Sequence, residues 1–263
     1  VNGGTIDGVK GNMVSIRGGK VGNENIYPKV TAKANVIYLK DGGEGDGSSA
    51  ENAIAWNKGL GLINGNATVV VCGPVTFNSN FWFGPGKGYE GTVLITSVFD
   101  GVDYRTTNEA AIIFGSNWRN GVPSGTVIFD NIAFISRGSN CSIYCDNQDV
   151  TFGRDVVCVV EENAAPIAIY AGSANDLGAC QNYIDSTSTS AANSGKYLAK
   201  LTVMSGNWGN ISGTGNGSAG KPRENNGTAI SVYSGVKGGS ISTDQKEGKM
   251  INGLRTLILN NAG

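Results

Sequence analysis

Two short stretches bring carboxylates and arginines close together, which is the minimum set of groups for cleaving a glycosidic bond. The stretches are "DGVDYR" and "CDNQDVTFGRD", and their charged residues are Asp100, Asp103, Arg105, Asp146, Asp149, Arg154 and Asp155. Two carboxylates on either side of a sugar linkage can divide the roles of acid and base or nucleophile. Exposed Asp residues more often hold turns. We therefore keep these residues as catalytic candidates and favour the structural role.

A third acidic stretch, "DGGEGDGSS", offers Asp41, Glu44 and Asp46. Carboxylate oxygens are the hard ligands that Ca²⁺ prefers. The spacing is not that of an EF-hand loop, so calcium is an optional ligand here and no cofactor is required. The alternative is a loop held for structural reasons alone.

Aromatic residues lie in stretches that read as loops, where a core has little room for them. The segment "FWFGPGKGYE" at 81–90 carries Trp82, Phe83 and Tyr89, and single tryptophans occur in "GSNWRNG" (Trp118) and "SGNWGN" (Trp208). Flat apolar rings with polar neighbours suit stacking against sugars. These five residues are the predicted carbohydrate contacts. The alternative is packing of the loops onto the protein itself or onto a neighbouring unit.

Composition excludes two classes of partner. Charged residues make up 16% of the 263 residues and the net charge is −1, without the clustered basic face that nucleic acids need. No apolar run approaches the roughly 20 residues of a membrane span. The chain opens in mid-pattern at "VNGGTIDGVKG", as expected for a mature or excised piece of a longer protein.

Five cysteines are an odd number, so at least one is unpaired within the chain. Cys72 and Cys158 lie in apolar runs, where they read as buried small hydrophobic residues. Bridges between Cys141 and Cys145, or between Cys145 and Cys180, stay open as alternatives. A zinc site is not expected, since the chain has no His to add to them.

Short strands dominate the rest of the sequence. β-Branched or aromatic residues alternate with polar ones, and the runs end at Gly, Asn, Asp or Ser. The predicted strands are 68–77, 92–99, 110–115, 125–136, 141–145, 149–160, 166–171, 197–205, 208–212, 228–233 and 254–260. One helix is predicted at 51–63, where Ala53, Trp56, Leu60 and Ile63 fall at helical spacing. Ser48 and Glu51 form its expected capping box.

Three all-β topologies accommodate many short strands. A sandwich would need more two-residue hairpin turns, and a propeller would repeat every 40 to 50 residues with an aromatic signature. A parallel β-helix needs only that each turn stack apolar residues on the turn below, while loops of any length leave the coil. We therefore predict an all-β, single-stranded solenoid, with the helix near 51–63 covering its apolar end.

The segment "ANVIYLKDGGEGDGSSAENAIAWNKGLGLINGNATVVVCGPVTF" at 34–77 resembles the opening of pectate-lyase-like right-handed β-helix domains of secreted and cell-surface bacterial proteins. Strand, Asp/Gly-rich loop, capping helix and first strand follow in that order. Later stretches, such as "KLTVMSGNWGNISG" and "AISVYSGVKGGSIS", resemble further coils. The resemblance implies a right-handed parallel β-helix and an extracellular or cell-surface location.

The resemblance does not carry an activity with it. The lyases of this fold use Ca²⁺ and an Arg or Lys base, and the polygalacturonases use three Asp and a His. This sequence lacks the His, the "RxPxxR" lyase signature and the Asn-Thr-Asp, Asp-Asp and Arg-Ile-Lys arrangements. We therefore expect a noncatalytic structural or adhesive segment. The alternatives are a polysaccharide lyase or glycoside hydrolase, and a carbohydrate-binding module.

Two regions are expected along the chain. Residues 1–34 form a Gly-rich strand segment that continues from, or stacks on, a neighbouring unit, and 35–263 form the β-helix with its capping loop and helix at 40–63. The segments "VNGGTIDGVKGNMVSIRGGKVG" and "VYSGVKGGSIST" share a pattern of paired glycines with small and β-branched residues. Open coil ends are templates for further strands. Neighbouring copies or a glycan are therefore the expected partners.

Overall fold

The structure, a computed structural model, consists mainly of strands in parallel sheets. It describes the backbone of 19–21, 24–26, 35–63, 65–79, 81–83, 91–120, 126–145, 149–171, 199–212, 228–237, 241–242 and 254–260, and side chains in 35–63, 65–79, 91–118, 126–145, 149–171 and 201–211. Helices in these ranges are single turns: α1 (Trp56–Gly59), the 3₁₀ turn η1 (Leu60–Leu62) and α2 (Tyr104–Thr107). The all-β prediction is confirmed. No helix in the described ranges is long and apolar enough to span a membrane.

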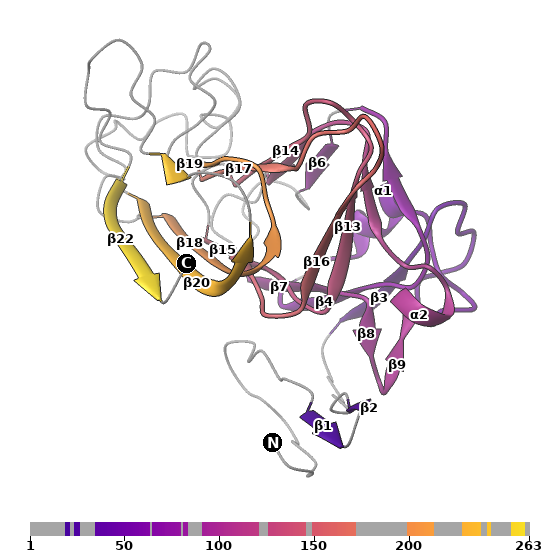
Figure 1. Cartoon of the computed structure of the whole chain (residues 1–263). Coiled ribbons are helices and arrows are strands. Elements are labelled where there is room, and N and C mark those ends of the chain that lie inside the picture. The colour runs from indigo at the N-terminus through magenta and orange to yellow at the C-terminus, as the bar shows by residue number, and fades with distance from the viewer. Residues whose placement is uncertain are drawn as a thin grey trace, which may run out of the picture.

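The largest sheet has eight parallel strands, and its neighbours follow one another in chain order. They are β3 (Val36–Leu39), β4 (Ala67–Val71), β7 (Thr92–Thr96), β12 (Thr126–Phe129), β15 (Asp149–Phe152), β18 (Ala199–Asn207), β20 (Thr228–Lys237) and β22 (Leu254–Asn260). Because each strand pairs with the one from the previous pass of the chain, the sheet grows by one strand per pass (Figure 1).

Two smaller parallel sheets grow in the same way. The second contains β5 (Val75–Phe77), β10 (Ile112–Phe114), β13 (Ile132–Ser136) and β16 (Val156–Val160). The third contains β6 (Phe81–Phe83), β11 (Trp118–Asn120), β14 (Ser142–Tyr144), β17 (Ala168–Tyr170), β19 (Ile211–Ser212) and β21 (Ile241–Ser242). From β4 to β17 the chain visits the three sheets in a constant order, and we call one such pass a winding.

The long predicted strands break where the chain turns from one sheet to the next. The run 125–136 divides into β12 and β13 at Asp130 and Asn131, and Asn131 takes a left-handed φ of 50°. Asn tolerates this conformation better than most residues, so it supplies the corner. Successive corners are also hydrogen-bonded, because Ser97 N donates to Asn131 O at 2.9 Å.

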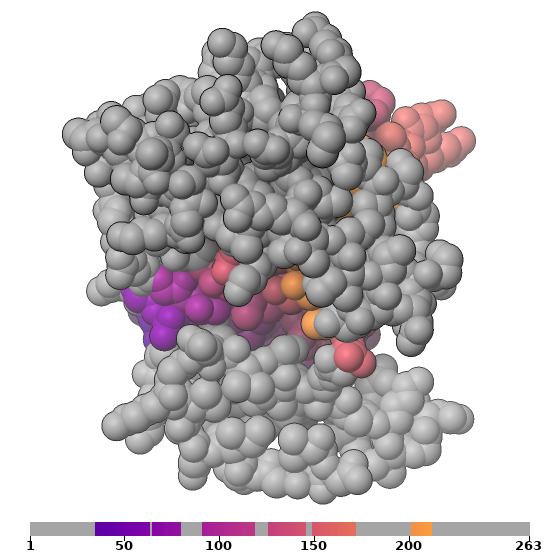
Figure 2. Space-filling model, turned by 90° about the vertical axis from the view of Figure 1, so that its left-hand side faces the viewer, coloured from indigo at the N-terminus to yellow at the C-terminus, as the bar shows by residue number. Residues whose placement is uncertain are grey.

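The core is built from residues stacked in register between windings. Parallel pairing aligns Ile95, Phe129 and Phe152, each at most 1% exposed, on β7, β12 and β15. The rings of Phe129 and Phe152 stack with centroids 5.2 Å apart and an interplanar angle of 7°. On the face shown in Figure 2, the described residues run from purple early windings to orange late ones. Buried apolar residues of one winding therefore stack on buried apolar residues of the next.

The predicted helix at 51–63 is shorter than expected, and its capping box is wrong. α1 begins only at Trp56, its N-cap Ala55 makes no side-chain hydrogen bond, and Ser49 accepts a bond from Asn52 N instead. The backbone before Trp56 is hydrogen-bonded outside the helix, because Asn52 O accepts from Gly47 N at 2.7 Å. The burial prediction is nevertheless confirmed at Trp56 and Ile63, each 5% exposed.

Of the predicted segment 1–34, the structure describes only the antiparallel pair β1 (Gly19–Val21) and β2 (Glu24–Ile26). The remainder of that prediction lies outside the described residues.

Candidate functional site

A side loop of residues 97–109 leaves the windings between β7 and β10. It holds an antiparallel hairpin of β8 (Val98–Phe99) and β9 (Val102–Asp103), followed by α2, and projects beside β3 and β4 (Figure 1). Asp100 and Gly101 form its tight turn with φ of 50° and 82°. An Asp-Gly pair suits this turn, which requires positive φ at both positions. The local sequence thus dictates an antiparallel hairpin between strands that belong to parallel sheets.

The side loop brings together charged residues from the two predicted clusters. Arg105 Nε lies 2.9 Å from Asp103 Oδ1, and Arg105 Nη2 lies 2.7 Å from Asp103 Oδ2. The same Nη2 donates to Oδ2 of Asp155, between β15 and β16, at 3.0 Å. We call Asp103, Arg105 and Asp155 the charge clamp. It fastens the side loop to a corner two windings further along the stack.

The electrostatics of the clamp fit a fixed ion pair. The side chains of Arg105 and Asp103 are only 13% and 11% exposed, whereas that of Asp155 is 44% exposed. Burial alone would lower the pKa of Arg105, but hydrogen bonds and charge from Asp103 and Asp155 raise it above its ordinary value. Asp103 also accepts from Arg105 N at 3.0 Å as the N-cap of α2. The carboxylate of Asp103 is therefore committed to structural contacts.

Removal of the clamp arginine gives a direct test of this assignment. We expect Arg105→Met to lower the free energy of unfolding by about 2 kcal/mol, because two carboxylates lose a charged hydrogen-bond partner and one of them is largely buried. Denaturant unfolding measures the change. Arg137→Met is the matched control: its ion pair with Glu161 is exposed on both sides (48% and 38%) and should contribute less than about 1 kcal/mol. Equal losses in both variants would contradict the clamp.

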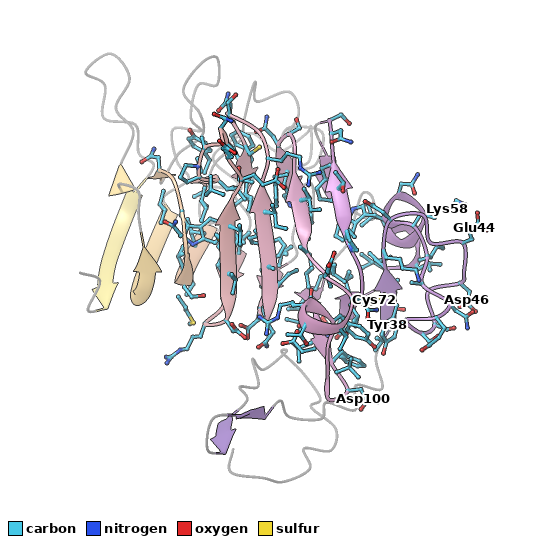
Figure 3. The ribbon with its side chains drawn as sticks, turned by 45° about the vertical axis from the view of Figure 1, so that its right-hand side comes forward. Tyr38, Glu44, Asp46, Lys58, Cys72 and Asp100 are labelled. Atoms are coloured by element: carbon cyan, nitrogen blue, oxygen red, sulfur yellow. The ribbon has the colours of Figure 1, made fainter. Side chains whose placement is uncertain are left out.

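The other acidic candidates belong to other points of the chain. Asp100 lies at the hairpin tip (Figure 3), Asp149 begins β15, and Asp146 lies outside the described residues. Sequence reasoning missed Asp130, which is 4% exposed and accepts from Asn131 N at 3.1 Å and Asp155 N at 3.4 Å. Its signal was the Asp-Asn pair that interrupts the run 125–136.

Aromatic residues hold the side loop against the outer face of β3 and β4. The ring of Tyr38 lies edge-on to Phe99 and Tyr104, with centroid distances of 6.1 and 6.3 Å. Asn108 Nδ2 donates to Cys72 O at 3.0 Å on the adjacent strand end, and Figure 3 places Tyr38 and Cys72 in the same region. Burial, followed by the charge of Tyr104, raises the pKa of Tyr38 from 10.0 to about 12.

This shift predicts alkaline sensitivity with a definite sign. The folded protein keeps the Tyr38 proton to higher pH than the unfolded chain, so the stabilisation is complete below pH 10 and is lost between pH 10 and 12. Burial raises the pKa of Cys158 to about 12 and that of Cys72, with the same sign. Across this range the unfolding free energy of the parent protein should fall relative to that of Tyr38→Phe, which has no ionisable group at this position. Parallel curves would contradict the assignment.

The cysteines mostly follow the expectation of small buried residues. Cys72 is 1% exposed, Cys158 is partly buried, and both are free thiols. Cys141 is also free, so the Cys141–Cys145 bridge is wrong. The thiol of Cys141 instead donates a hydrogen bond to Phe114 O at 3.1 Å. The alternative with Cys180 involves a residue outside the described ranges.

The proposed calcium ligands are exposed, and two of them accept hydrogen bonds from different backbone N–H groups. Asp41 Oδ2 accepts from Thr76 N at 2.9 Å, and Asp46 Oδ1 accepts from Ser48 N at 2.9 Å. Glu44 and Asp46 lie apart on the same loop (Figure 3). Within the described residues, no three acidic, Cys or His side chains form a group that could hold a metal ion. Calcium binding here stays a prediction.

Two of the five predicted sugar contacts are core residues. Trp118 and Trp208 are both 0% exposed, and Trp208 Nε1 donates to Ser205 O at 2.7 Å. A buried indole offers no face to a sugar, so these two predictions are corrected. Trp82 and Phe83 belong to β6, whose side chains are outside the description, as is Tyr89 altogether.

Register places two tyrosines of the third sheet side by side. Tyr144 of β14 pairs with Tyr170 of β17. Their neighbours Ile143 and Ile169 are core residues, so the two tyrosines lie on the outer face of the sheet. Tyr144 and Tyr170 stack with centroids 5.0 Å apart. We call Tyr144 and Tyr170 the outer row.

Comparisons with protein-family models, curated proteins and solved structures found no match.

Proposed function

We propose that this chain is a noncatalytic segment of a right-handed parallel β-helix, serving as a structural or adhesive unit of a secreted or cell-surface protein. The constant order in which each winding visits three parallel sheets supports the architecture. The charge clamp is the observation that carries the functional part. In the clamp, Asp103 and Asp155, one from each predicted catalytic cluster, both bind Arg105 and so connect two windings.

An activity screen on pectin, dextran and host glycans tests this proposal. We expect no polymer to be cut. Cleavage that disappears in Asp103→Asn or Asp155→Asn, while the melting temperature stays that of the parent protein, would overturn it. If Asp103→Asn loses both cleavage and folding, Asp155→Asn decides between the two explanations. Asp155 is more exposed (44%), so its replacement disturbs the fold less.

Carbohydrate binding is the second candidate, and the outer row favours it. Tyr144 and Tyr170 stack on the outer face of the third sheet, and aligned aromatic rings suit sugars. Tyr170 is the more accessible of the pair, since Tyr144 is 3% exposed and Tyr170 only partly buried.

A glycan array tests this second function. Binding by the parent protein should fall in Trp82→Ala and in Tyr170→Ala. Val157→Ala is the control, because Val157 is 45% exposed on the second sheet. Binding that ignores both aromatic substitutions would remove the outer row from consideration.

A further inference from the structure

The side loop makes contacts that cross the order of the windings. Within the described ranges, strand pairing in the three parallel sheets joins only adjacent passes. Counting from β4, the side loop belongs to the second winding, yet its residues reach β3, the first winding and the fourth. It is therefore the element through which distant passes can influence one another.

Toward the start of the stack, the side loop packs on β3 and β4. A buried apolar cluster lies there, separate from the interior core, and consists of Ala53, Val70 and Cys72. Phe99 and Tyr104 of the side loop pack against it together with Tyr38 of β3. The ring centroid of Tyr38 lies 6.1 Å from that of Phe99 and 6.3 Å from that of Tyr104. Asn108 Nδ2 adds a hydrogen bond to Cys72 O at 3.0 Å, so this anchor combines apolar burial with a polar contact.

Toward the later windings, the side loop is held by polar contacts. Ser97 N donates to Asn131 O at 2.9 Å in the corner of the third winding. In the charge clamp, Arg105 Nη2 donates to Asp155 Oδ2 at 3.0 Å in the corner of the fourth winding. Opening of the fourth winding therefore removes a charged partner from Arg105, whose side chain is only 13% exposed, and this loss is unfavourable.

The two anchors lie far apart on the large sheet. β4, β7 and β12 separate β3, which carries Tyr38, from β15, which precedes Asp155. Neighbouring strands are about 4.8 Å apart, so about 19 Å of sheet lies between β3 and β15. Residues at such a distance usually contribute to stability independently. A dependence between Tyr38 and Asp155 therefore runs either through the side loop or strand by strand through the sheet, and cutting the clamp separates these two routes.

We propose that the side loop is a strap that makes β3 and the windings up to Asp155 open as one cooperative unit. Strand pairing alone holds each pass through its neighbours, so that passes can detach in turn. The strap changes this, because a side loop released at one anchor is held less firmly at the other. The passes from β18 onward lie beyond its span. The proposal rests on these contacts and holds whether or not the chain is catalytic.

Hydrogen exchange of the full chain, followed by mass spectrometry, tests the coupling. The probe is the exchange rate of the amides in 149–160, which cover β15 and β16, and the perturbation is Tyr38→Ala on β3. We expect Tyr38→Ala to speed this exchange roughly tenfold, a size typical of coupled residues. In the Asp155→Ala background, which cuts the strap at its far anchor, Tyr38→Ala should change the rate by less than about threefold.

Glu161→Ala is the matched control for Asp155→Ala. Both residues flank β16, and their side chains are similarly exposed, at 38% for Glu161 and 44% for Asp155. The ion pair of Glu161, however, is with Arg137 at the end of β13, in the adjacent winding. In the Glu161→Ala background, Tyr38→Ala should therefore keep its full effect on 149–160.

Three outcomes would overturn the proposal: unchanged exchange of 149–160 in Tyr38→Ala, an effect of equal size with and without Asp155, or equal acceleration in β18, which would indicate a global loss of stability. Circular dichroism establishes that each variant is folded. If Tyr38→Ala does not fold, Asn108→Ala replaces it, because it removes the bond to Cys72 O at the same anchor. Polymer cleavage in the activity screen would refute the noncatalytic function and leave the exchange result unaffected.

Discussion

Trp118→Ala is expected to lower the free energy of unfolding by about 3–5 kcal/mol, the range for deleting a large buried aromatic side chain. The indole of Trp118 is 0% exposed. Its ring centroid lies 5.5 Å from Trp56, 5.6 Å from Phe77 and 5.5 Å from Phe129. Truncation therefore leaves a cavity where Trp56 of α1 meets aromatic residues of three successive windings.

Denaturant unfolding of Trp118→Ala, compared with Leu62→Ala, measures this effect. Leu62 is 42% exposed, so its truncation should cost much less. Near-ultraviolet circular dichroism should also lose intensity, because the coupled aromatic rings lose a member. A loss below about 1 kcal/mol for Trp118→Ala would mean that the indole is a surface group, as the sequence had suggested.

Gly45→Ala is expected to cost about 1–3 kcal/mol, the usual penalty for forcing extra volume into a packed site. A Cβ at position 45 would overlap the backbone of Asn52, which cannot swing away as a flexible side chain can. It would also disturb the hydrogen bond from Gly45 N to Ala53 O, 3.0 Å long, in the loop that follows β3.

The matched control is Gly61→Ala in the 3₁₀ turn that follows α1. A Cβ at position 61 meets nothing within 4 Å, so alanine should be neutral or stabilise by up to about 1 kcal/mol through the unfolded chain. Comparing the melting temperatures of Gly45→Ala and Gly61→Ala distinguishes a local clash at position 45 from a general effect of replacing glycine. Equal melting temperatures would contradict the close approach at Gly45.

The strand content could be predicted because alternation of apolar and polar residues is a local property. Residues 126–129, for instance, alternate as partly buried and buried along β12. The corners were harder, since Asn131 looks like an ordinary polar residue until the bend is seen. The helix was overestimated for the opposite reason. Ala53 and Trp56 have the burial that helical spacing predicts, yet the backbone before Trp56 pairs with the β3 loop.

The candidate site was less predictable, because its contacts cross between windings. Arg105 and Asp155 are fifty positions apart, and only the register of the sheets brings them within 3.0 Å. Trp118 and Trp208 were misplaced because Gly and Asn flank both, as in a loop. Around Trp118 those neighbours mark a very short strand, since β11 has three residues and Trp118 turns into the core within that length. Trp208 instead follows the end of the nine-residue strand β18.

The nearest-neighbour pattern of the windings has a consequence for how the protein folds. In the part of the chain that the structure describes, each strand of the three parallel sheets pairs only with strands of the adjacent passes, so stability approximates a one-dimensional sum of local and adjacent-unit energies. Folding in such a system can nucleate in one place and spread. We expect the region around Trp56, where the hydrogen-bonded loop 43–55 meets packed aromatic rings, to act as the nucleus. From there order would propagate one unit at a time, and damage in a distant unit would leave the nucleus intact.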